Sequence, residues 1–526
     1  MTLSFRSCSE SVCSRSRANR SSSFALRVAD TTISTPSVRS KRQGNSLDPK
    51  RLVTRLWSQA LVAILTLLPH QAWAATGLDG AAMRWPYALP FAGLLLSIAL
   101  GPLLFAKFWH HHYGKIAAAW SLLALASLVI FAGGMATLAA LVHAVLVEYL
   151  GFIVLLFSLY VVAGGVLITG DIKATPAINA GILALGTLGA SVVGTTGAAM
   201  ILIRPLIRAN RPRRHNTHVV IFFIILVANV GGALSPLGDP PLFVGFLHGV
   251  DFFWTTRALW LQTAIVAGLL LAMFVVVDIW RFRSEPPPDG AGPEQPVRIR
   301  GLVNLVLIAA IVASLLASAM WKPGIAFDIL GTRLELEDIA RNLVLLAIAA
   351  LSVWLTPDEH RQANGFTWEP IREVAKLFAG IFVAIIPVIA MLNAGHHGAF
   401  AWLLSAVTAP DGAPREVAYF WFTGLMSALL DNAPTYLLFF ELAGGDAQVL
   451  MHQLSGTLAS ISMGAVYMGA LTYIGNAPNF MVSSIASENG IEMPSFFGYL
   501  LRAGVVLIPL FLLLTLLPVA PILHWH

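Results

Sequence analysis

The stretch "GALSPLGDPPLF" (Gly232–Phe243) interrupts an apolar run with three prolines, two glycines and an aspartate. It has a near-copy, "GALTYIGNAPNF" (Gly469–Phe480), which lies 237 positions further along and shares six of its twelve residues. The same offset pairs "GTTGAAM" (Gly194–Met200) with "DNAPTYL" (Asp431–Leu437) without a gap. Each half of the chain therefore carries two polar, small-residue breaks at matching positions, and this indicates a duplication.

The composition predicts a protein that crosses a membrane several times. Of the 526 residues, 57% are hydrophobic and 11% are charged, whereas soluble domains average about 25% charged residues. The net charge of +6 comes from residues 1–50, which hold nine Lys/Arg and three Asp/Glu. The basic pI therefore gives no argument for a nucleic-acid partner. Both cysteines, Cys8 and Cys13, also lie in this leader, so the rest of the chain has no disulfide chemistry.

The first 75 residues differ from the rest. Residues 1–50 are rich in Ser and Arg and read as a disordered leader or as a misassigned start. Residues 51–75 have a basic beginning, an apolar core and an Ala-Trp-Ala sequence before Ala75, which is the layout of a secretory signal peptide. We expect the true start near Val53; the alternative is an uncleaved first helix.

Twelve apolar segments follow in two sets of six. A polar, Pro-rich linker at 281–300, expected to be cytoplasmic, separates the sets. The segments lie at about 85–106, 116–142, 145–169, 175–208, 217–248 and 257–280, and then at 301–320, 341–356, 374–394, 417–442, 455–486 and 497–523. We predict an all-α polytopic membrane protein with one transmembrane repeat over 85–280 and another over 301–523. Each repeat is expected to hold about five transmembrane helices, a re-entrant hairpin and a broken helix.

The loop charges predict that the two repeats have opposite orientations. Basic residues favour cytoplasmic loops, which places "AKFWHHHYGK", "GDIKATP" and "RPLIRANRPRRH" inside. Segment 175–208 then enters and leaves the membrane on the cytoplasmic side. Segment 417–442 is flanked by Glu416 and "ELAGGD" and is expected to enter and leave on the external side.

The breaks predict unwound backbone near the middle of the membrane, and hence a binding site. Irregular backbone survives at that depth only where protein or a water-filled cavity surrounds it. Proline stops a helix and glycine permits unusual backbone angles. Breaks paired across inverted repeats mark the substrate site in secondary transporters. The residues expected to cause them are Gly231, Gly232, Pro236, Gly238, Pro240, Pro241, Gly469, Gly475 and Pro478, with Pro434 in the second hairpin.

Two aspartates in the breaks, Asp239 and Asp431, are the candidates for ion or proton coupling. A carboxylate inside a membrane is costly and usually functional, and burial disfavours its charged form, so it can exchange a proton. The structural alternative is that each caps a half-helix. Nearby oxygens suit Na⁺, although each could instead bond one helix to another: Asn229, Ser235, Asn432, Thr472, Asn476, Asn479, Thr195 and Thr196. We expect no metal beyond a transported Na⁺.

The remaining polar groups carry less information. We interpret His110–His112 and His396–His397 as solvated loops, and His143 and Glu148 as interfacial residues at the outer membrane boundary.

The pattern resembles the ion-transporter superfamily, which includes sodium/proton antiporters, arsenite permeases, dicarboxylate/sodium symporters and citrate carriers. The stretches "NVGGALSPLGDPP" (Asn229–Pro241) and "LLDNAPTY" (Leu429–Tyr436) carry the likeness, which covers about 85–523. The resemblance implies an elevator-type movement and a homodimer in a lipid bilayer. We expect the plasma membrane, the inner membrane of a bacterium.

Our leading functional prediction is sodium/proton antiport, because two intramembrane carboxylates without a basic residue in the breaks suit a cation. The alternative is a sodium- or proton-coupled carrier of citrate or another carboxylate. An intramembrane aspartyl protease is disfavoured, because Pro236–Asp239 lacks the Gly-x-Gly-Asp motif and Leu430 stands where a Tyr-Asp pair needs tyrosine. No nucleotide-binding loop is present, so we expect no enzyme and no cofactor.

Overall fold

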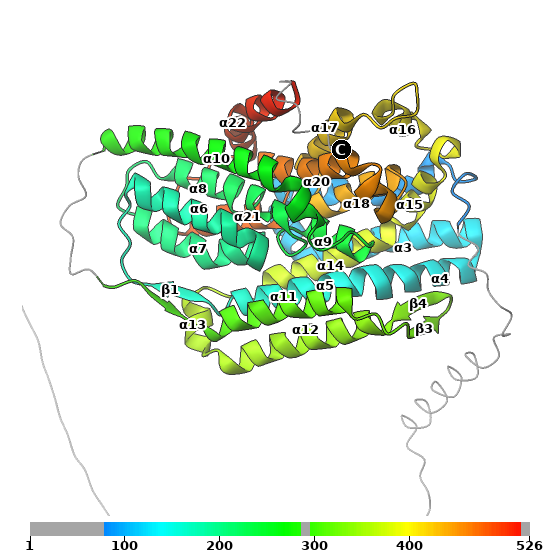
Figure 1. The fold of residues 1–526 in the computed structure, drawn as a ribbon, viewed down its shortest axis with the longest axis horizontal. Coiled ribbons are helices and arrows are strands. Elements are labelled where there is room, and N and C mark those ends of the chain that lie inside the picture. Colours follow the sequence, from blue (N-terminus) through cyan, green and yellow to red (C-terminus); the bar gives the residue numbers. More distant parts are fainter. Residues whose placement is uncertain (1–77, 286–294, 517–526) are drawn as a thin grey trace, which may run out of the picture. The chain divides into compact units, whose positions relative to one another are not determined.

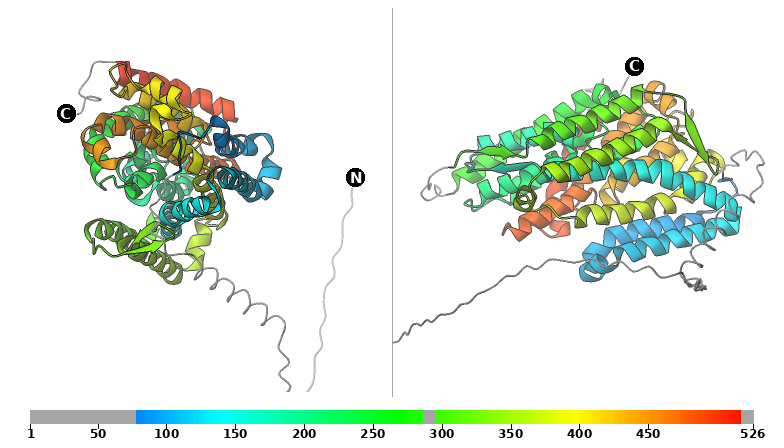
Figure 2. Two further views of the ribbon diagram at one scale, coloured as in Figure 1. Left: turned by 90° about the vertical axis from the view of Figure 1, so that its right-hand side faces the viewer. Right: turned by 90° about the horizontal axis from the view of Figure 1, so that it is seen from below.

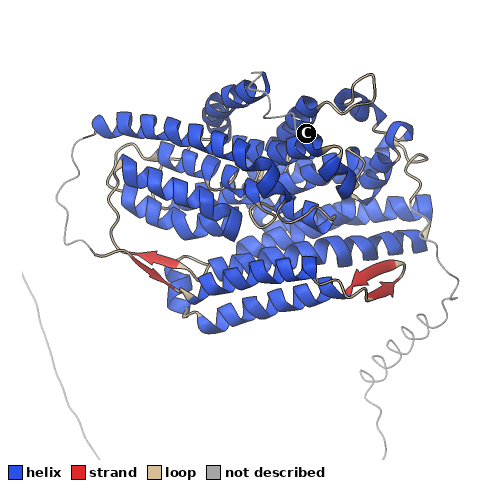
Figure 3. Ribbon diagram, in the orientation of Figure 1, coloured by secondary structure: helices blue, strands red, loops and turns tan. Residues whose placement is uncertain are grey.

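The computed structural model describes residues 78–285 and 295–516. In these ranges the chain is almost entirely helical, with two small two-stranded sheets (Figure 3). The predicted leader and signal-like segment lie outside the described residues, as do the middle of the linker and residues 517–523 of the second repeat.

The first half of the chain supplies nine helices and one strand to the described part. After a 3₁₀ turn at Trp85–Ala88 they are α2 (Leu89–Leu104), α3 (Ala106–Ala132), α4 (Gly134–His143), a π-helical segment (Ala144–Tyr149), α5 (Leu150–Ala163), β1 (Leu167–Thr169), α6 (Pro176–Val193), α7 (Thr195–Asn210), α8 (Thr217–Leu226), a 3₁₀ turn (Val230–Leu234), α9 (Pro240–Leu247) and α10 (Trp254–Arg283).

The second half begins with a strand that pairs back to the first. Its elements are β2 (Arg298–Arg300), α11 (Val303–Met320), β3 (Ala326–Ile329), β4 (Thr332–Glu335), α12 (Leu336–Leu355), α13 (Asp358–Ala363), α14 (Glu369–Ala384), α15 (Ile386–Asn393), a 3₁₀ turn (Gly395–His397), α16 (Ala401–Val407), α17 (Glu416–Leu429), α18 (Asn432–Leu442), α19 (Ala447–His452), α20 (Ser455–Met468), a 3₁₀ turn (Gly469–Leu471), α21 (Ala477–Glu488) and α22 (Phe496–Leu516).

The described helices confirm a polytopic membrane protein. Nine of them are long and apolar enough to cross a bilayer, and the pair α14–α15, bent by 41°, makes a tenth if counted as one span. Most helices run along one direction, as the three views together show (Figures 1 and 2).

The segment from 175 to 208 folds back on itself as predicted. Its turn is Gly194, whose φ of +80° falls in the region that favours glycine. Asn179 near the start of α6 donates to Asn210 at the end of α7 (2.9 Å), so both ends of this hairpin lie together. In the second hairpin, α18 likewise folds back along α17, and the ring centroids of Tyr419 on α17 and Phe439 on α18 are 6.3 Å apart.

Both predicted broken helices are present, and prolines begin their second halves. Pro240 and Pro241 open α9, and Pro478 opens α21. At these positions the missing N–H has no partner to lose. Pro434 likewise lies in the first turn of α18, so only Pro236 stands in fully unwound backbone.

The break glycines are placed as predicted, but for another reason. None of Gly231, Gly232, Gly238, Gly469 and Gly475 has a positive φ. They instead allow backbone segments to approach closely. A Cβ on Gly238 would collide with the backbone of Gly232, and one on Gly475 would collide with the backbone of Gly469.

Some element boundaries differ from the prediction. The turn between the second and third segments lies at Gly133 (φ +84°), not between 142 and 145, so Gly134–Ala163 is one 30-residue helix. Hydropathy could not show this turn, because the residues on both sides of it are apolar. His110–His112 lie inside α3 rather than in a loop. The predicted helix over 145–169 ends at Ala163, because β1 pairs antiparallel with β2 at the end of the linker.

Candidate functional site

The carboxylate of Asp239 is the centre of a buried cluster in which four breaks meet. Its Oδ1 accepts hydrogen bonds from Thr195 Oγ1 (3.0 Å) and Asn476 Nδ2 (2.8 Å). Its Oδ2 accepts one from Asn432 Nδ2 (2.7 Å). The side chain is 1% exposed. These donors come from the tip of the first hairpin, the second broken helix and the tip of the second hairpin, so Asp239 joins the two halves of the chain.

The same four residues begin four helices. Thr195 and Asn432 are the first residues of α7 and α18, and Asp239 and Asn476 precede α9 and α21 as their N-caps. A helix N-terminus carries partial positive charge from its free N–H groups. Four such ends around one point favour negative charge there, and this offsets the charge of Asp239 in a place with no basic side chain among its hydrogen-bond partners.

Two further predicted residues, Asn229 and Asn479, connect the broken helices. Asn229 Nδ2 donates to Asn479 Oδ1 (2.7 Å) and to the carbonyl of Ile224 (2.8 Å). Asn479 Nδ2 donates to the carbonyls of Gly469 and Thr472, each at 2.9 Å. These amides satisfy carbonyls that the unwound turns leave without helical partners, which is the structural role weighed against ion binding.

Ser235 and Thr472 form matching bonds in the two halves. Ser235 donates to the carbonyl of Ser191, and Thr472 Oγ1 donates to the carbonyl of Ala428 (2.5 Å). Both the donors and the acceptors are 237 positions apart. These hydroxyls anchor each broken helix to the hairpin of its own half and do not line the cavity described next.

A cavity of about 90 Å³ lies beside the cluster. Asp431, Thr195, Thr196 and Asn476 form its polar wall. The rest of the lining is mainly apolar and comes mostly from α5, α14 and α21: Leu156, Leu159, Tyr160, Ile371, Val374, Phe378 and Met481. No Lys, Arg or His is among the described residues that line it.

Asp431 differs from Asp239 in its surroundings. It caps α18, accepting a hydrogen bond from the backbone N–H of Ala433 (3.2 Å), as the structural alternative predicted. Its side chain nevertheless faces the cavity and interacts electrostatically with Asp239. Of the two predicted carboxylates, Asp431 is thus the one placed to contact a ligand.

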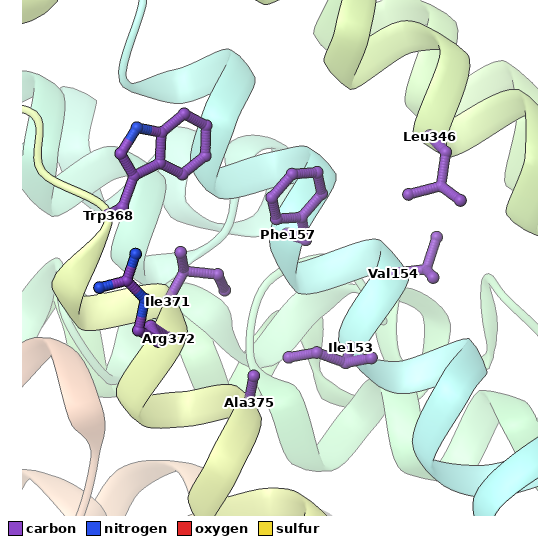
Figure 4. A pocket seen from close by; sticks show the side chains of 8 residues that line it. All are labelled: Ile153, Val154, Phe157, Leu346, Trp368, Ile371, Arg372 and Ala375. Atoms are coloured by element: carbon purple, nitrogen blue, oxygen red, sulfur yellow. The ribbon is translucent and has the colours of Figure 1, made fainter. Parts of the chain in front are cut away.

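A larger hollow of about 400 Å³ opens nearby between α5, α12 and α14 (Figure 4). Arg372 is its one charged lining residue, and the rest are apolar, among them Phe157, Trp368 and Leu346. Ile371 lines both spaces. This lining suits hydrocarbon, not a polar ion, so the smaller cavity is the candidate site.

Buried carboxylates outside the breaks were missed in the sequence, and Asp278 is the most deeply buried of them. Asp278 near the end of α10 accepts hydrogen bonds from Arg213 (2.5 Å), His218 (2.9 Å) and Asn179 (3.0 Å). It anchors the open end of the first hairpin and does not contact the cavity. A lone aspartate in the apolar run "FVVVDIW" gives the same signal as Asp431 and could have revealed it.

Comparison with known proteins fits this arrangement. No curated protein matches the chain. Residues 80–519, well over half of the chain, match the family described as "Putative citrate transport" (CitMHS_2), which lies within the ion-transporter group that the breaks resemble. The chain therefore belongs to this citrate transport family.

Proposed function

We propose that this protein is a secondary transporter that carries citrate or a related carboxylate together with Na⁺ or H⁺. The observation that carries the proposal is the convergence of four helix N-termini on a cavity whose remaining lining is mainly apolar. Helix N-termini attract anions through their partial positive charge and through backbone N–H groups that make no helical bond. At α9 the partial charge alone is available, because Pro240 and Pro241 have no N–H. In a site without Lys or Arg, they are the available partners for a substrate carboxylate.

The coupling to a cation follows from Asp431. A carboxylate substrate and the carboxylate of Asp431 would repel one another in the same cavity. A Na⁺ ion or a proton on Asp431 removes this repulsion, because either one neutralises the side chain. Thr195 and Thr196 add hydroxyl oxygens that can ligate Na⁺. Substrate and cation would then bind together, as symport requires.

We further propose that the two halves form inverted repeats and that the cavity changes sides by an elevator-type movement. In support, the hairpin tips meet at Asp239, while α6–α7 and α17–α18 extend from that point toward opposite sides of the bundle (Figure 1). The cavity lies between these elements and the helices α5 and α14. The homodimer and the bacterial inner membrane stay predictions.

The carboxylate-carrier proposal replaces sodium/proton antiport as our leading interpretation. The family match favours citrate. In addition, Asp239 already accepts three hydrogen bonds from neutral donors. These bonds occupy most of the roughly four lone-pair sites of the carboxylate, so Asp239 has little room left to ligate a Na⁺ ion.

The test is transport by the purified protein in proteoliposomes. We expect labelled citrate to accumulate when an inward Na⁺ or proton gradient is imposed, and little uptake when both gradients are absent. In a parallel assay, Na⁺ is added to vesicles that hold a pH gradient and contain no citrate, and the pH gradient is followed over time. If Na⁺ dissipates the gradient and citrate is not taken up under any gradient, the protein is an antiporter and the proposal is wrong.

A further inference from the structure

Glu148 is a buried carboxylate that the central cavity does not use. It lies at the midpoint of the helix Gly134–Ala163, in the π-helical segment Ala144–Tyr149. At 1.5 Å per residue it stands roughly 21 Å from the start of that helix. Its position at the outer membrane boundary stays a prediction. π-Helical segments occur often at functional sites. The side chain is 12% exposed.

The carboxylate of Glu148 is only partly compensated. Its Oε1 lies 3.9 Å from His143 Nε2. Its Oε2 is buried and has no hydrogen-bond partner among the described residues. An ionised carboxylate in an apolar environment needs donors for both oxygens, whereas a protonated one does not carry that cost.

Two more titratable groups face Glu148 from the half-helices of the central site. The helix of Glu148 packs against the end of α9: a Cβ on Gly151, one turn beyond Glu148, would lie 3.3 Å from the side chain of Leu247, the neighbour of His248. The charges of His248 and Glu441 act on Glu148 from there. His248 caps the end of α9, and its Nε2 lies 3.9 Å from Glu441 Oε1 at the end of α18. His248 Nδ1 bonds to the carbonyl of Val244 (2.9 Å), so Nδ1 carries a hydrogen and Nε2 is free to take a proton.

The cluster is connected to the central site by two packed helices. α9 runs from Asp239 to His248, and α18 runs from Asp431 to Glu441. These helices lie against each other: a Cβ on Gly245 of α9 would meet the Tyr436 ring of α18. Each helix has 8 to 11 residues, so the cluster is roughly 12 to 16 Å from the two aspartates.

We propose that Glu148, His248 and Glu441 form a proton-binding site, separate from the central cavity and loaded from the side of the membrane on which Gly134 lies. Loop charges predict that this side is external. Protonation removes the repulsion between Glu148 in the π-helical segment and Glu441 at the end of α18. Helix α18 begins after Asp431 and packs against α9, which begins after Asp239. External protons therefore stabilise the packed arrangement of these elements and regulate the proposed carboxylate transport, on which this inference rests.

The other charged groups on the neighbouring helices have partners of their own. Helix α14 packs against the π-helical segment. The carbonyl of Ala375 on α14 accepts a hydrogen bond from Tyr149 of that segment (3.0 Å). The remaining groups pair as follows: Glu369 with Tyr113 and Arg372, Glu373 with Trp109, Lys376 with the Tyr113 ring, Arg341 with Asp338, and Asn393 with Glu441. This leaves His143, His248 and Glu441 as the groups that respond to Glu148.

The test measures labelled citrate uptake into right-side-out vesicles, with internal pH held constant while external pH is varied. Wild-type uptake is expected to rise as external pH falls, up to about tenfold for one pH unit, the limit that a single proton sets. Glu148→Gln and Glu441→Gln imitate the protonated site, so their uptake should change at least about threefold less than that of the wild type over the same unit. Any dependence that remains belongs to the coupling proton at Asp431. Glu335→Gln, an equal charge change at a carboxylate whose side chain is 36% exposed, should keep the wild-type profile.

Infrared titration of the purified protein provides a second readout that does not need transport. The carbonyl stretch of a protonated carboxylic acid should titrate in the wild type, and Glu148→Gln should lack it, with size-exclusion chromatography confirming the fold of each variant. Full external-pH dependence in both glutamine variants, or an unchanged infrared band in Glu148→Gln, would overturn the proposal. If the wild type takes up no citrate, the proposed function fails, and the infrared band alone decides the proton site.

Discussion

At the residue scale, two aspartates that look equivalent in the sequence have different environments. Asp239 accepts hydrogen bonds from three side chains and is buried, whereas Asp431 accepts a backbone bond and lines the cavity. Sequence reasoning identified both, because a charge in an apolar run is conspicuous. It could not assign their roles, because these depend on residues up to 237 positions away.

For Asp239→Asn we expect loss of both transport and stability. The amide would present an NH₂ group to donors that now bond to a carboxylate oxygen, leaving at least one buried donor unsatisfied. Such a loss costs about 1–3 kcal/mol. Thermal unfolding of the purified variant should show a lower melting temperature, and labelled citrate uptake should be abolished. An unchanged melting temperature would contradict the hydrogen-bonding role.

For Asp431→Asn we expect transport to fail while the fold remains intact. Asparagine can still accept the capping bond from Ala433 N–H, so the end of α18 is preserved. The charge that holds the coupling cation is lost, and Na⁺- or proton-driven accumulation should therefore disappear. The melting temperature of the variant is the control for folding, and it should be close to that of the wild type. Undiminished gradient-driven uptake would show that Asp431 does not couple transport.

The other polar candidates show how far residue type alone can predict a role. Thr195, Asn432 and Asn476 bond to Asp239, and Thr196 lines the cavity. Ser235, Thr472, Asn229 and Asn479 instead bond to backbone carbonyls at the breaks or to one another. Oxygen donors suit both tasks, and only the direction of each side chain separates them.

At the element scale, the breaks were predictable and the turn at Gly133 was not. Prolines and glycines mark the breaks because they change backbone geometry within an apolar run. The turn at Gly133 has apolar helices on both sides, so it leaves no trace in hydropathy. Because that turn lies about ten residues earlier than predicted, Glu148 stands in the middle of a helix and not near its start.

Gly238→Val should reduce transport more than membrane insertion. A Cβ there would collide with the backbone of Gly232. The two backbone segments of the first break would have to separate, and this would displace Asp239. Insertion follows the summed hydrophobicity of the segment, which valine does not lower. The comparison is Gly268→Ala in α10, where a Cβ meets nothing within 4 Å and both properties should be unchanged. Equal loss of membrane-inserted protein and of uptake would indicate a folding role.

Asp278→Asn should destabilise the first hairpin without touching the cavity. Arg213, with side-chain exposure of 4%, would lose its short ion pair with Asp278 and keep the one with Glu285 (3.2 Å). Leaving a buried charge without any partner typically costs about 3–5 kcal/mol, so the loss here should be smaller. We expect a lower melting temperature and faster proteolysis at residues 211–216, which connect α7 and α8. Unaltered stability would show that Arg213 finds an equivalent partner.

At the scale of the whole molecule, the opposite orientation of the two halves rests on loop charge and on the hairpins. The open end of the first hairpin lies beside Arg213 and Asp278, and the second hairpin ends before Asp446, the N-cap of α19. We predict that residues 208–215 are cytoplasmic and residues 442–448 external. Because Cys8 and Cys13 are the sole native cysteines, replacing both with serine gives a cysteine-free background.

In that background, Arg214→Cys in the α7–α8 connection and Gln448→Cys at the start of α19 place single thiols at exposed positions. A membrane-impermeant maleimide added to intact cells should label Gln448→Cys and leave Arg214→Cys unlabelled until the membrane is opened. Citrate uptake by each variant confirms that it is folded. The expected asymmetry arises because arginine-rich loops are retained inside. Labelling of both thiols from the same side would mean that the halves share one orientation, and the pairing of the breaks at Asp239 would then need a different topology.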